Sequence, residues 1–192
     1  MRLPPIAPEA LDTEQRRLYD DMKAGVASKY DAFVTVREDG ALLGPWSAWL
    51  YQPELGTAFW TVTKAMTAFK VLPDDVRQVV ILVVGARFKA AYEIYAHVSV
   101  AKAKREISNA RLATLAAGER PGDLTEQEAA GYDVAAALIN GGVLPEPTYR
   151  QALALFGQRG IAELIYLVGR YCFVSTTLNG FAIGVPDNAA AN

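Results

Sequence analysis

The chain has 192 residues, of which 52 % are hydrophobic, and a formal net charge of −2. This length suits one domain with a sizeable core, and the charge excludes the basic face that nucleic-acid binding requires. A single cysteine, Cys172, excludes an intrachain disulfide. We expect neither a targeting segment nor a membrane span, and therefore a cytoplasmic protein.

The first part of the chain predicts a helix, a loop and the start of a second helix. Asp12 and Gln15 have the spacing of a capping box, which predicts a helix from there to about residue 27. Residues 33–43 are expected to form a loop that contains an Asp-Gly turn. Pro45 then suits the first position of a helix.

Two further prolines mark the starts of the next helices. Pro53 opens one over 54–69, where apolar residues recur at helical spacing. Pro73, which two acids follow, opens another at the place that these residue types favour. The valine-rich run 79–84 is also compatible with a buried strand, but its acidic start and the polar residues before it favour a helix.

The rest of the chain carries the same periodicity and predicts five helices over 90–105, 108–117, 125–139, 147–156 and 161–181. The strand signal is weak throughout, so we predict an all-α fold. We expect a single domain over 1–186 and a disordered polar tail over 187–192.

An internal repeat relates two of these helices. Residues 79–85 align with residues 163–169, and both segments are apolar and end in glycine. A true repeat would imply a pseudo-twofold arrangement in which each glycine lies where another helix packs closely, with a site between the halves. The alternative is a chance similarity between two apolar helices.

The clearest candidate for chemistry is a histidine–carboxylate pair. The one histidine, His97, follows Glu93 by four residues, which places both side chains on one face of a helix. A neighbouring carboxylate raises the pKa of an imidazole and orients its ring, so the pair can act as a general acid or base. Tyr92 flanks the pair and Gln78 lies on the preceding helix. The alternative is a purely structural hydrogen-bonded pair.

Other site classes are not indicated. One histidine and one cysteine cannot form a typical zinc shell, so we expect no metal. The chain has no glycine-rich phosphate loop and no serine in a nucleophile elbow.

Several segments resemble the carboxymuconolactone decarboxylase-like family, which belongs to the alkylhydroperoxidase-D-like superfamily. These segments cover nearly the whole chain and are 2–6, 39–45, 72–82, 91–97 and 178–181. The Tyr-Glu-x-x-x-His run that ends at His97 is the most specific of the matches. The resemblance implies an alkylhydroperoxidase-D-like helical bundle, a homo-oligomer such as a trimer or hexamer, and no organic cofactor.

Members of one branch of this superfamily are peroxidases that use a Cys-x-x-Cys motif, with a proton-relaying glutamate on the preceding helix. By this resemblance Ala90 and Glu93 occupy the cysteine positions, Gln78 occupies the glutamate position, and His97 matches the family histidine. The resemblance therefore implies a member that is not a thiol peroxidase.

The decarboxylase branch implies a small cyclic carboxylic acid or lactone as substrate. His97, oriented by Glu93, would protonate the enolate that loss of CO₂ leaves. The residues expected to bind this substrate are Gln78, Tyr92, Arg87 and Trp46. A surface position or a salt bridge is the alternative for Arg87. The alternative function is a non-catalytic, oligomeric helical module. Gln78 at the position of the relay glutamate favours this alternative, whereas Glu93 and His97 favour the enzyme.

Overall fold

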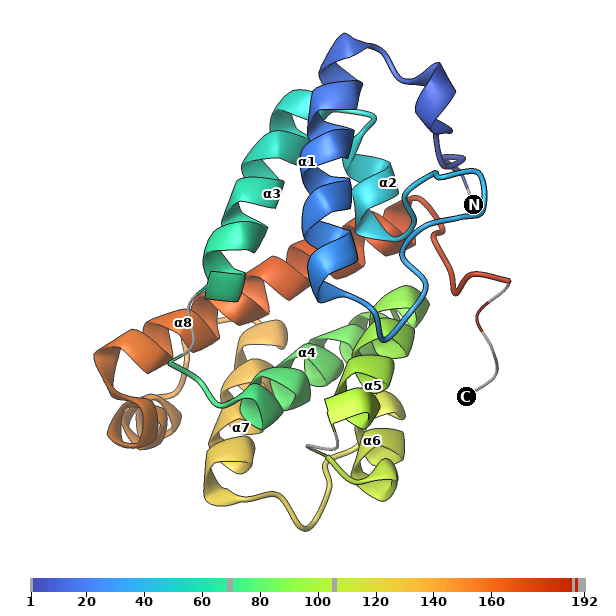
Figure 1. Cartoon of the computed structure of the whole chain (residues 1–192). Helices are drawn as coiled ribbons and strands as arrows, with labels where there is room; N and C mark the ends of the chain where they lie inside the picture. Colours follow the sequence, from blue (N-terminus) through green and yellow to red (C-terminus); the bar gives the residue numbers. More distant parts are fainter. Residues whose placement is uncertain (1, 69–70, 105–106, 188, 190–192) are drawn as a thin grey trace.

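The computed structural model describes residues 2–68, 71–104, 107–187 and 189, and its regular elements there are helices (Figure 1). In chain order they are η1 (Pro8–Ala10), α1 (Thr13–Lys29), α2 (Pro45–Trp49), α3 (Pro53–Ala68), α4 (Asp74–Phe88), α5 (Ala91–Lys104), α6 (Asn109–Ala116), α7 (Glu126–Ile139) and α8 (Glu146–Gly180). The prediction of an all-α fold is confirmed. The predicted helix ends Phe69 and Arg105, and most of the predicted tail, lie outside the described residues.

Capping residues start the helices where the sequence predicts. The Asp12 carboxylate accepts hydrogen bonds from the backbone N–H groups of Glu14 and Gln15, and the Gln15 side chain accepts one from the Asp12 N–H. Thr125 and Glu128 form the same reciprocal capping box at the start of α7. The valine-rich segment forms α4 because the surrounding helices bury it on all sides.

Helix α8 joins the two helices that the sequence predicts near the C-terminus. Gly157 interrupts it with φ 67° and ψ 179°, a conformation that favours glycine. By length and composition alone, α8 is the one helix among the described residues that could cross a membrane. Core helices of globular domains pass the same test, and α8 packs along α4 and α7.

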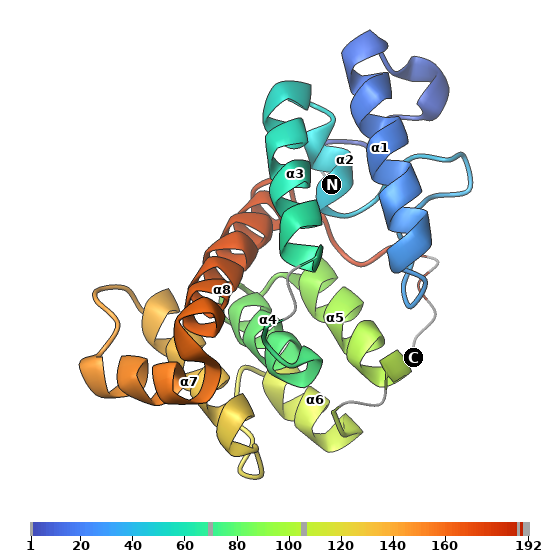
Figure 2. The same cartoon turned by 60° about the vertical axis from the view of Figure 1, so that its left-hand side comes forward.

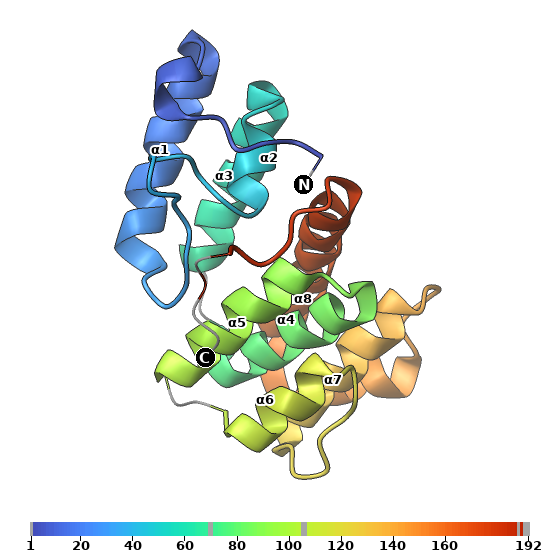
Figure 3. The same cartoon turned by 90° about the vertical axis from the view of Figure 1, so that its right-hand side faces the viewer.

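Two hydrophobic cores meet along α8. One lies among α4, α6, α7 and the middle of α8, and the other lies among α1, α2, α3, the start of α5 and the end of α8. Figures 1 and 2 show α8 running from the α4–α7 group to the α1–α3 group. Figure 3 shows α4 and α5 beneath the α1–α3 group. The residues of α5 and α8 at this junction therefore face both cores.

The proposed repeat places its two glycines in different surroundings. The aligned segments lie on α4 and α8, which pack against each other. A Cβ atom at Gly85 would lie 3.5 Å from the Cβ of Glu93, so α5 does approach closely there. Gly169 is exposed, and a Cβ built there would have no neighbour within 4 Å. The prediction of close helix packing is therefore wrong for Gly169 within the protomer.

Candidate functional site

Two helices bring the predicted pair and its partner together. On α5, the Oε2 atom of Glu93 lies 3.4 Å from the Nε2 atom of His97. From α4, the Oε1 atom of Gln78 lies 2.8 Å from the Nδ1 atom of His97. Because an amide oxygen only accepts, this arrangement places the hydrogen of the neutral ring on Nδ1. The Nε2 atom is then free to take a proton from Glu93.

Helix α8 adds two residues that sequence reasoning did not assign to the site. The ring of Tyr171 packs edge-to-face on His97, with centroids 5.1 Å apart. The Arg170 guanidinium lies 4.8 Å from the centroid of the Tyr171 ring and donates a hydrogen bond of 3.4 Å to its hydroxyl. The signal that could have found Arg170 is a lone cation inside the apolar stretch 161–181.

A pocket of about 350 Å³ opens beside His97. Its lining residues come from α3, α4, α5, α8 and the segment after α1, and they are Tyr30, Thr67, Asp74, Arg77, Gln78, Ile81, His97, Val100, Lys104, Arg170 and Tyr171. We call it the outer pocket. This volume lies within the range of small-molecule sites, at the small end.

Of the three cations that line the outer pocket, two have carboxylate partners. Arg77 pairs with the buried Glu163, and Lys104 lies 2.9 Å from the Oδ2 atom of Asp74. Arg170 has no carboxylate within 4.0 Å in the described part of the chain. Arg170 is therefore the cation best able to receive an anionic group of a ligand.

A second, smaller space shares some of the same lining residues. It measures about 30 Å³, and its walls are Tyr30, Phe33, Pro45, Trp46, Trp49, Tyr92, Glu93, Ala96, His97, Arg170, Tyr171 and Val174. We call it the inner chamber. Four of these residues, Tyr30, His97, Arg170 and Tyr171, also line the outer pocket. They therefore border both spaces.

Burial keeps the histidine–carboxylate pair uncharged. It raises the pKa of the Glu93 carboxyl from 4.5 to about 7, although the positive charge of Arg170 opposes this. Burial also lowers the pKa of His97 from 6.5 to about 3, and the charges of Arg170 and Arg77 lower it further. The expectation that the carboxylate raises the imidazole pKa is thus wrong, because burial disfavours the charged imidazolium and the nearby arginines disfavour it further. Just below neutral pH the proton of the pair resides on Glu93.

The remaining predicted substrate-binding residues lie in different places. Trp46 and Tyr92 line the inner chamber, and the Tyr92 hydroxyl donates a hydrogen bond of 3.0 Å to the carbonyl of Val34. Arg87 is exposed in the last turn of α4 and lines a separate cleft with Lys89, not the space beside His97. The structure therefore does not bring Arg87 to the pair, because it lies nine positions beyond Gln78 along the helix.

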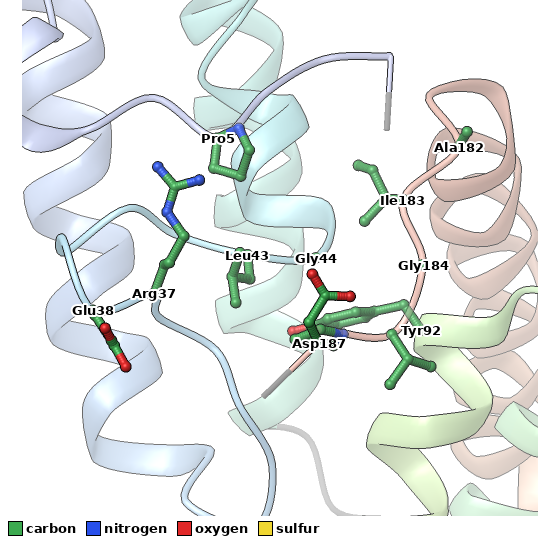
Figure 4. Close-up of a pocket in the computed structure, with 12 residues that line it drawn as sticks. Pro5, Arg37, Glu38, Leu43, Gly44, Tyr92, Ala182, Ile183, Gly184 and Asp187 are labelled. Atoms are coloured by element: carbon green, nitrogen blue, oxygen red, sulfur yellow. The ribbon is translucent and has the colours of Figure 1, made fainter. Parts of the chain in front are cut away.

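A larger pocket of about 520 Å³ lies beyond Tyr92, between the N-terminal segment, the 37–44 loop and the C-terminal segment (Figure 4). Arg37, the cation in its lining, forms an ion pair with Asp39, and the pocket contains no histidine–carboxylate pair. Of the two pockets, only the outer pocket is lined by a residue of the histidine–carboxylate pair. No three His, Cys, Asp or Glu side chains in the described part of the chain are placed to hold a metal ion.

Comparison with known proteins identifies the fold. No protein-family model matches the sequence, and no curated protein matches it either. Among solved structures, an uncharacterized peroxidase-related protein from Silicibacter sp. TM1040 matches with a TM-score of 0.75 at 16 % identity, over 100 % of this chain and 94 % of that one. The alkylhydroperoxidase AhpD core of a peroxidase-related protein from Ralstonia eutropha JMP134 matches with 0.74 at 14 % identity, over 97 % and 92 %.

The debrominase Bmp8, in a complex with 2,3,4-tribromopyrrole, matches with a TM-score of 0.72 at 12 % identity, over 97 % of this chain and 92 % of that one. These similarities establish that the chain has the alkylhydroperoxidase-D-like fold, as predicted. Because function resides in sites and not in folds, the activity has to be argued from the residues around His97.

Proposed function

We propose that this protein is a cofactor-independent enzyme that acts on a small cyclic carboxylic acid or lactone by acid–base chemistry. The observation that carries the proposal is the pairing of the buried Glu93 with the partly buried His97, which lines the outer pocket beside the cation Arg170. Buried titratable groups with opposing pKa shifts, gathered at a pocket, are typical of active sites.

The outer pocket suits a small anionic ring. Its volume of about 350 Å³ accommodates one ring with short substituents. The guanidinium of Arg170 would bind the carboxylate or the anionic carbonyl oxygen, and the amide of Gln78 would hydrogen-bond a second oxygen. The debrominase of the same fold in complex with a halogenated pyrrole lends support to a small ring as the ligand.

The proton path follows from the tautomer of His97. A carbanion in the outer pocket would take the hydrogen from Nδ1 after displacing Gln78 from it. Glu93 would pass its own proton to Nε2, which lies 3.4 Å away. The products of this step are a protonated substrate carbon, a neutral imidazole and a Glu93 carboxylate. The charge of Arg170 stabilises that carboxylate until solvent returns a proton.

Decarboxylation is the reaction that uses all of these groups. The bond between the ring carbon and the carboxylate carbon breaks, CO₂ leaves, and the electron pair moves into the adjacent carbonyl as an enolate. Arg170 stabilises the enolate oxygen, and His97 protonates the carbon. One proton is taken up for each CO₂ released. The electron pair of the broken bond stays on the substrate, so the reaction needs no oxidant or reductant.

The test is CO₂ release from a panel of lactone carboxylates and small cyclic carboxylic acids. We expect His97→Ala to lower kcat at least about a hundredfold, because general acid catalysis contributes on the order of 10²–10⁴. Arg170→Gln should raise KM as well, since it removes the anion-binding cation. The matched control is Arg87→Gln, which removes an exposed arginine from the same half of the molecule and should leave turnover unchanged.

A wild-type protein without turnover on any member of the panel would favour the alternative, a non-catalytic helical module. Turnover that survives His97→Ala would instead show that the enzyme works through other residues.

Thiol peroxidase chemistry is not part of the proposal. It needs a thiolate that attacks peroxide and a second thiol that resolves the sulfenic acid. The one cysteine, Cys172, is half-buried, packs against the core around α4, and has its pKa raised by burial. It lines neither the outer pocket nor the inner chamber.

We further propose that the protein is a homo-oligomer. Leu55 and Val62 lie seven residues apart on α3 and are about half exposed, and Tyr166 on α8 is 69 % exposed. Large apolar side chains in such positions favour burial against another subunit. Light scattering should give a mass of at least three chains, and the double variant Leu55→Glu/Val62→Glu should lower it. A wild-type monomer at micromolar concentration would contradict this proposal.

A further inference from the structure

The inner chamber carries an inference beyond the proposed activity. We propose that it is a binding site for a compact monovalent anion, either a free halide or the carboxylate group of a small acid. Binding requires no turnover, so this inference does not rest on the proposed function.

The first argument is a set of buried polar atoms without hydrogen-bond partners among the described residues. Trp46 Nε1, Trp49 Nε1, Arg170 Nε and Glu93 Oε2 all belong to this set, and all four residues line the chamber. Trp46 and Trp49 are each 5 % exposed, and Glu93 is 4 % exposed. Leaving such groups unpaired is costly, so their presence around one cavity indicates that a ligand completes them.

The second argument is the donor balance of this set. Indole and guanidinium nitrogens donate and cannot accept, so three of the four atoms require an acceptor. A water molecule accepts about two hydrogen bonds and leaves the charge of Arg170 uncompensated. A compact anion accepts from all three donors and neutralises that charge. Glu93 does not repel the anion, because burial favours its uncharged form by raising its pKa to about 7.

The third argument is that three elements hold the chamber in place. Trp46 and Trp49 are three residues apart on α2, so their indoles leave the helix on the same side. The loop before α2 is fixed by Gly44, whose carbonyl accepts a hydrogen bond of 2.8 Å from the Ser47 hydroxyl. Helices α5 and α8 supply Glu93 and Arg170 to the lining.

Size limits the ligand. About 30 Å³ accommodates roughly one water-sized group, which matches a halide ion or one carboxylate head and excludes a phosphate or an aromatic ring. The chamber shares Tyr30, His97, Arg170 and Tyr171 with the outer pocket. The ligand can therefore be a free anion or the carboxylate of a small acid whose remaining atoms stay in the outer pocket.

The test observes the tryptophan indoles directly. The chain has three tryptophans, and the third, Trp60, lies on α3 and does not line the chamber. Protein labelled with ¹⁵N-tryptophan would be titrated at pH 6 with sodium bromide and, separately, with sodium formate, in a sodium sulfate background of constant ionic strength. We expect the Nε1–H signals of Trp46 and Trp49 to shift saturably while the Trp60 signal stays in place.

Matched variants complete the design. Trp46→Phe and Trp49→Phe each remove one N–H donor and keep an aromatic ring, and an unchanged Trp60 signal shows that the variant is folded. Each should raise the Kd of the anion about tenfold or more, since hydrogen bonds to charged groups have that weight.

Saturation by both probes supports a free-anion site, and saturation by formate alone supports a subsite for the carboxylate of a small acid. No saturable shift with either probe, or an equal shift of Trp60, overturns the inference. The experiment measures anion binding and not turnover. A negative result would therefore overturn the anion site without bearing on the proposed enzymatic activity.

Discussion

The replacement Glu93→Gln tests the electrostatics of the site through the pH dependence of stability. In the unfolded chain the Glu93 carboxyl ionises near 4.5 and the His97 imidazole loses its proton near 6.5. In the folded chain these pKa values are about 7 and about 3. Between pH 4.5 and 6.5 the folded pair is neutral and the unfolded pair is a carboxylate and an imidazolium. The pair holds one titratable proton in both the folded and the unfolded state. The contributions of Glu93 and His97 to the pH dependence of stability therefore cancel in this interval.

The sign of each contribution follows from linkage. The raised pKa of Glu93 gives stability that falls as the pH rises from 4.5 to about 7, because only the unfolded state releases its proton there. The lowered pKa of His97 gives stability that falls as the pH drops below 6.5, because only the unfolded state takes up a proton. Glu93→Gln removes the first contribution and leaves the second.

The magnitude is large enough to measure. When the unfolded state binds one proton more than the folded state, the free energy of unfolding changes by about 3 kcal/mol over two pH units. The wild-type free energy of unfolding should therefore show no slope from this pair between pH 4.5 and 6.5. In Glu93→Gln it should rise by about 3 kcal/mol, relative to wild type, over the same interval.

Urea denaturation at four pH values from 4.5 to 7.5 provides the assay, with protein concentration held constant because an oligomer couples stability to concentration. The exposed Glu54→Gln on α3 is the matched control for the loss of one carboxyl group. A difference between Glu93→Gln and wild type that stays the same across this pH range would refute the reasoning that burial raises the pKa of Glu93.

Three further predictions concern stability and the thiol. Glu163→Ala should lower the free energy of unfolding by about 3–5 kcal/mol, because it takes the Glu163 carboxylate from the partly buried Arg77 and an acceptor from two backbone N–H groups; urea denaturation checks this. Gly44→Ala should lower the free energy of unfolding by about 3 kcal/mol in the same assay. Gly44 has φ 63°, and a Cβ atom there would lie 2.4 Å from the Tyr92 ring. The control is Gly169→Ala at an exposed helical position, which should leave this free energy unchanged or raise it. Cys172→Ser should leave turnover unchanged, and wild type should consume no peroxide with dithiothreitol as reductant; peroxide consumption that the variant abolishes would contradict this.

The sequence by itself determined the features that depend on local spacing. Helical periodicity and capping residues fix α1 and α7 because a helix satisfies its hydrogen bonds within a few residues. The pairing of Glu93 with His97 has the same origin, since residues four apart on one helix are neighbours in any fold.

Only the tertiary structure decided which distant residues join that pair. Gln78 reaches His97 because α4 packs against α5, and Arg170 reaches the site because α8 crosses the junction of the two cores. The sequence offers Arg87 as an anion-binding residue beside Gln78. In the structure Arg87 lies more than two helical turns beyond Gln78 along α4 and lines a different cleft. Burial also decided the charge state: a histidine beside a carboxylate predicts an ion pair in water, whereas desolvation at this junction keeps both groups neutral.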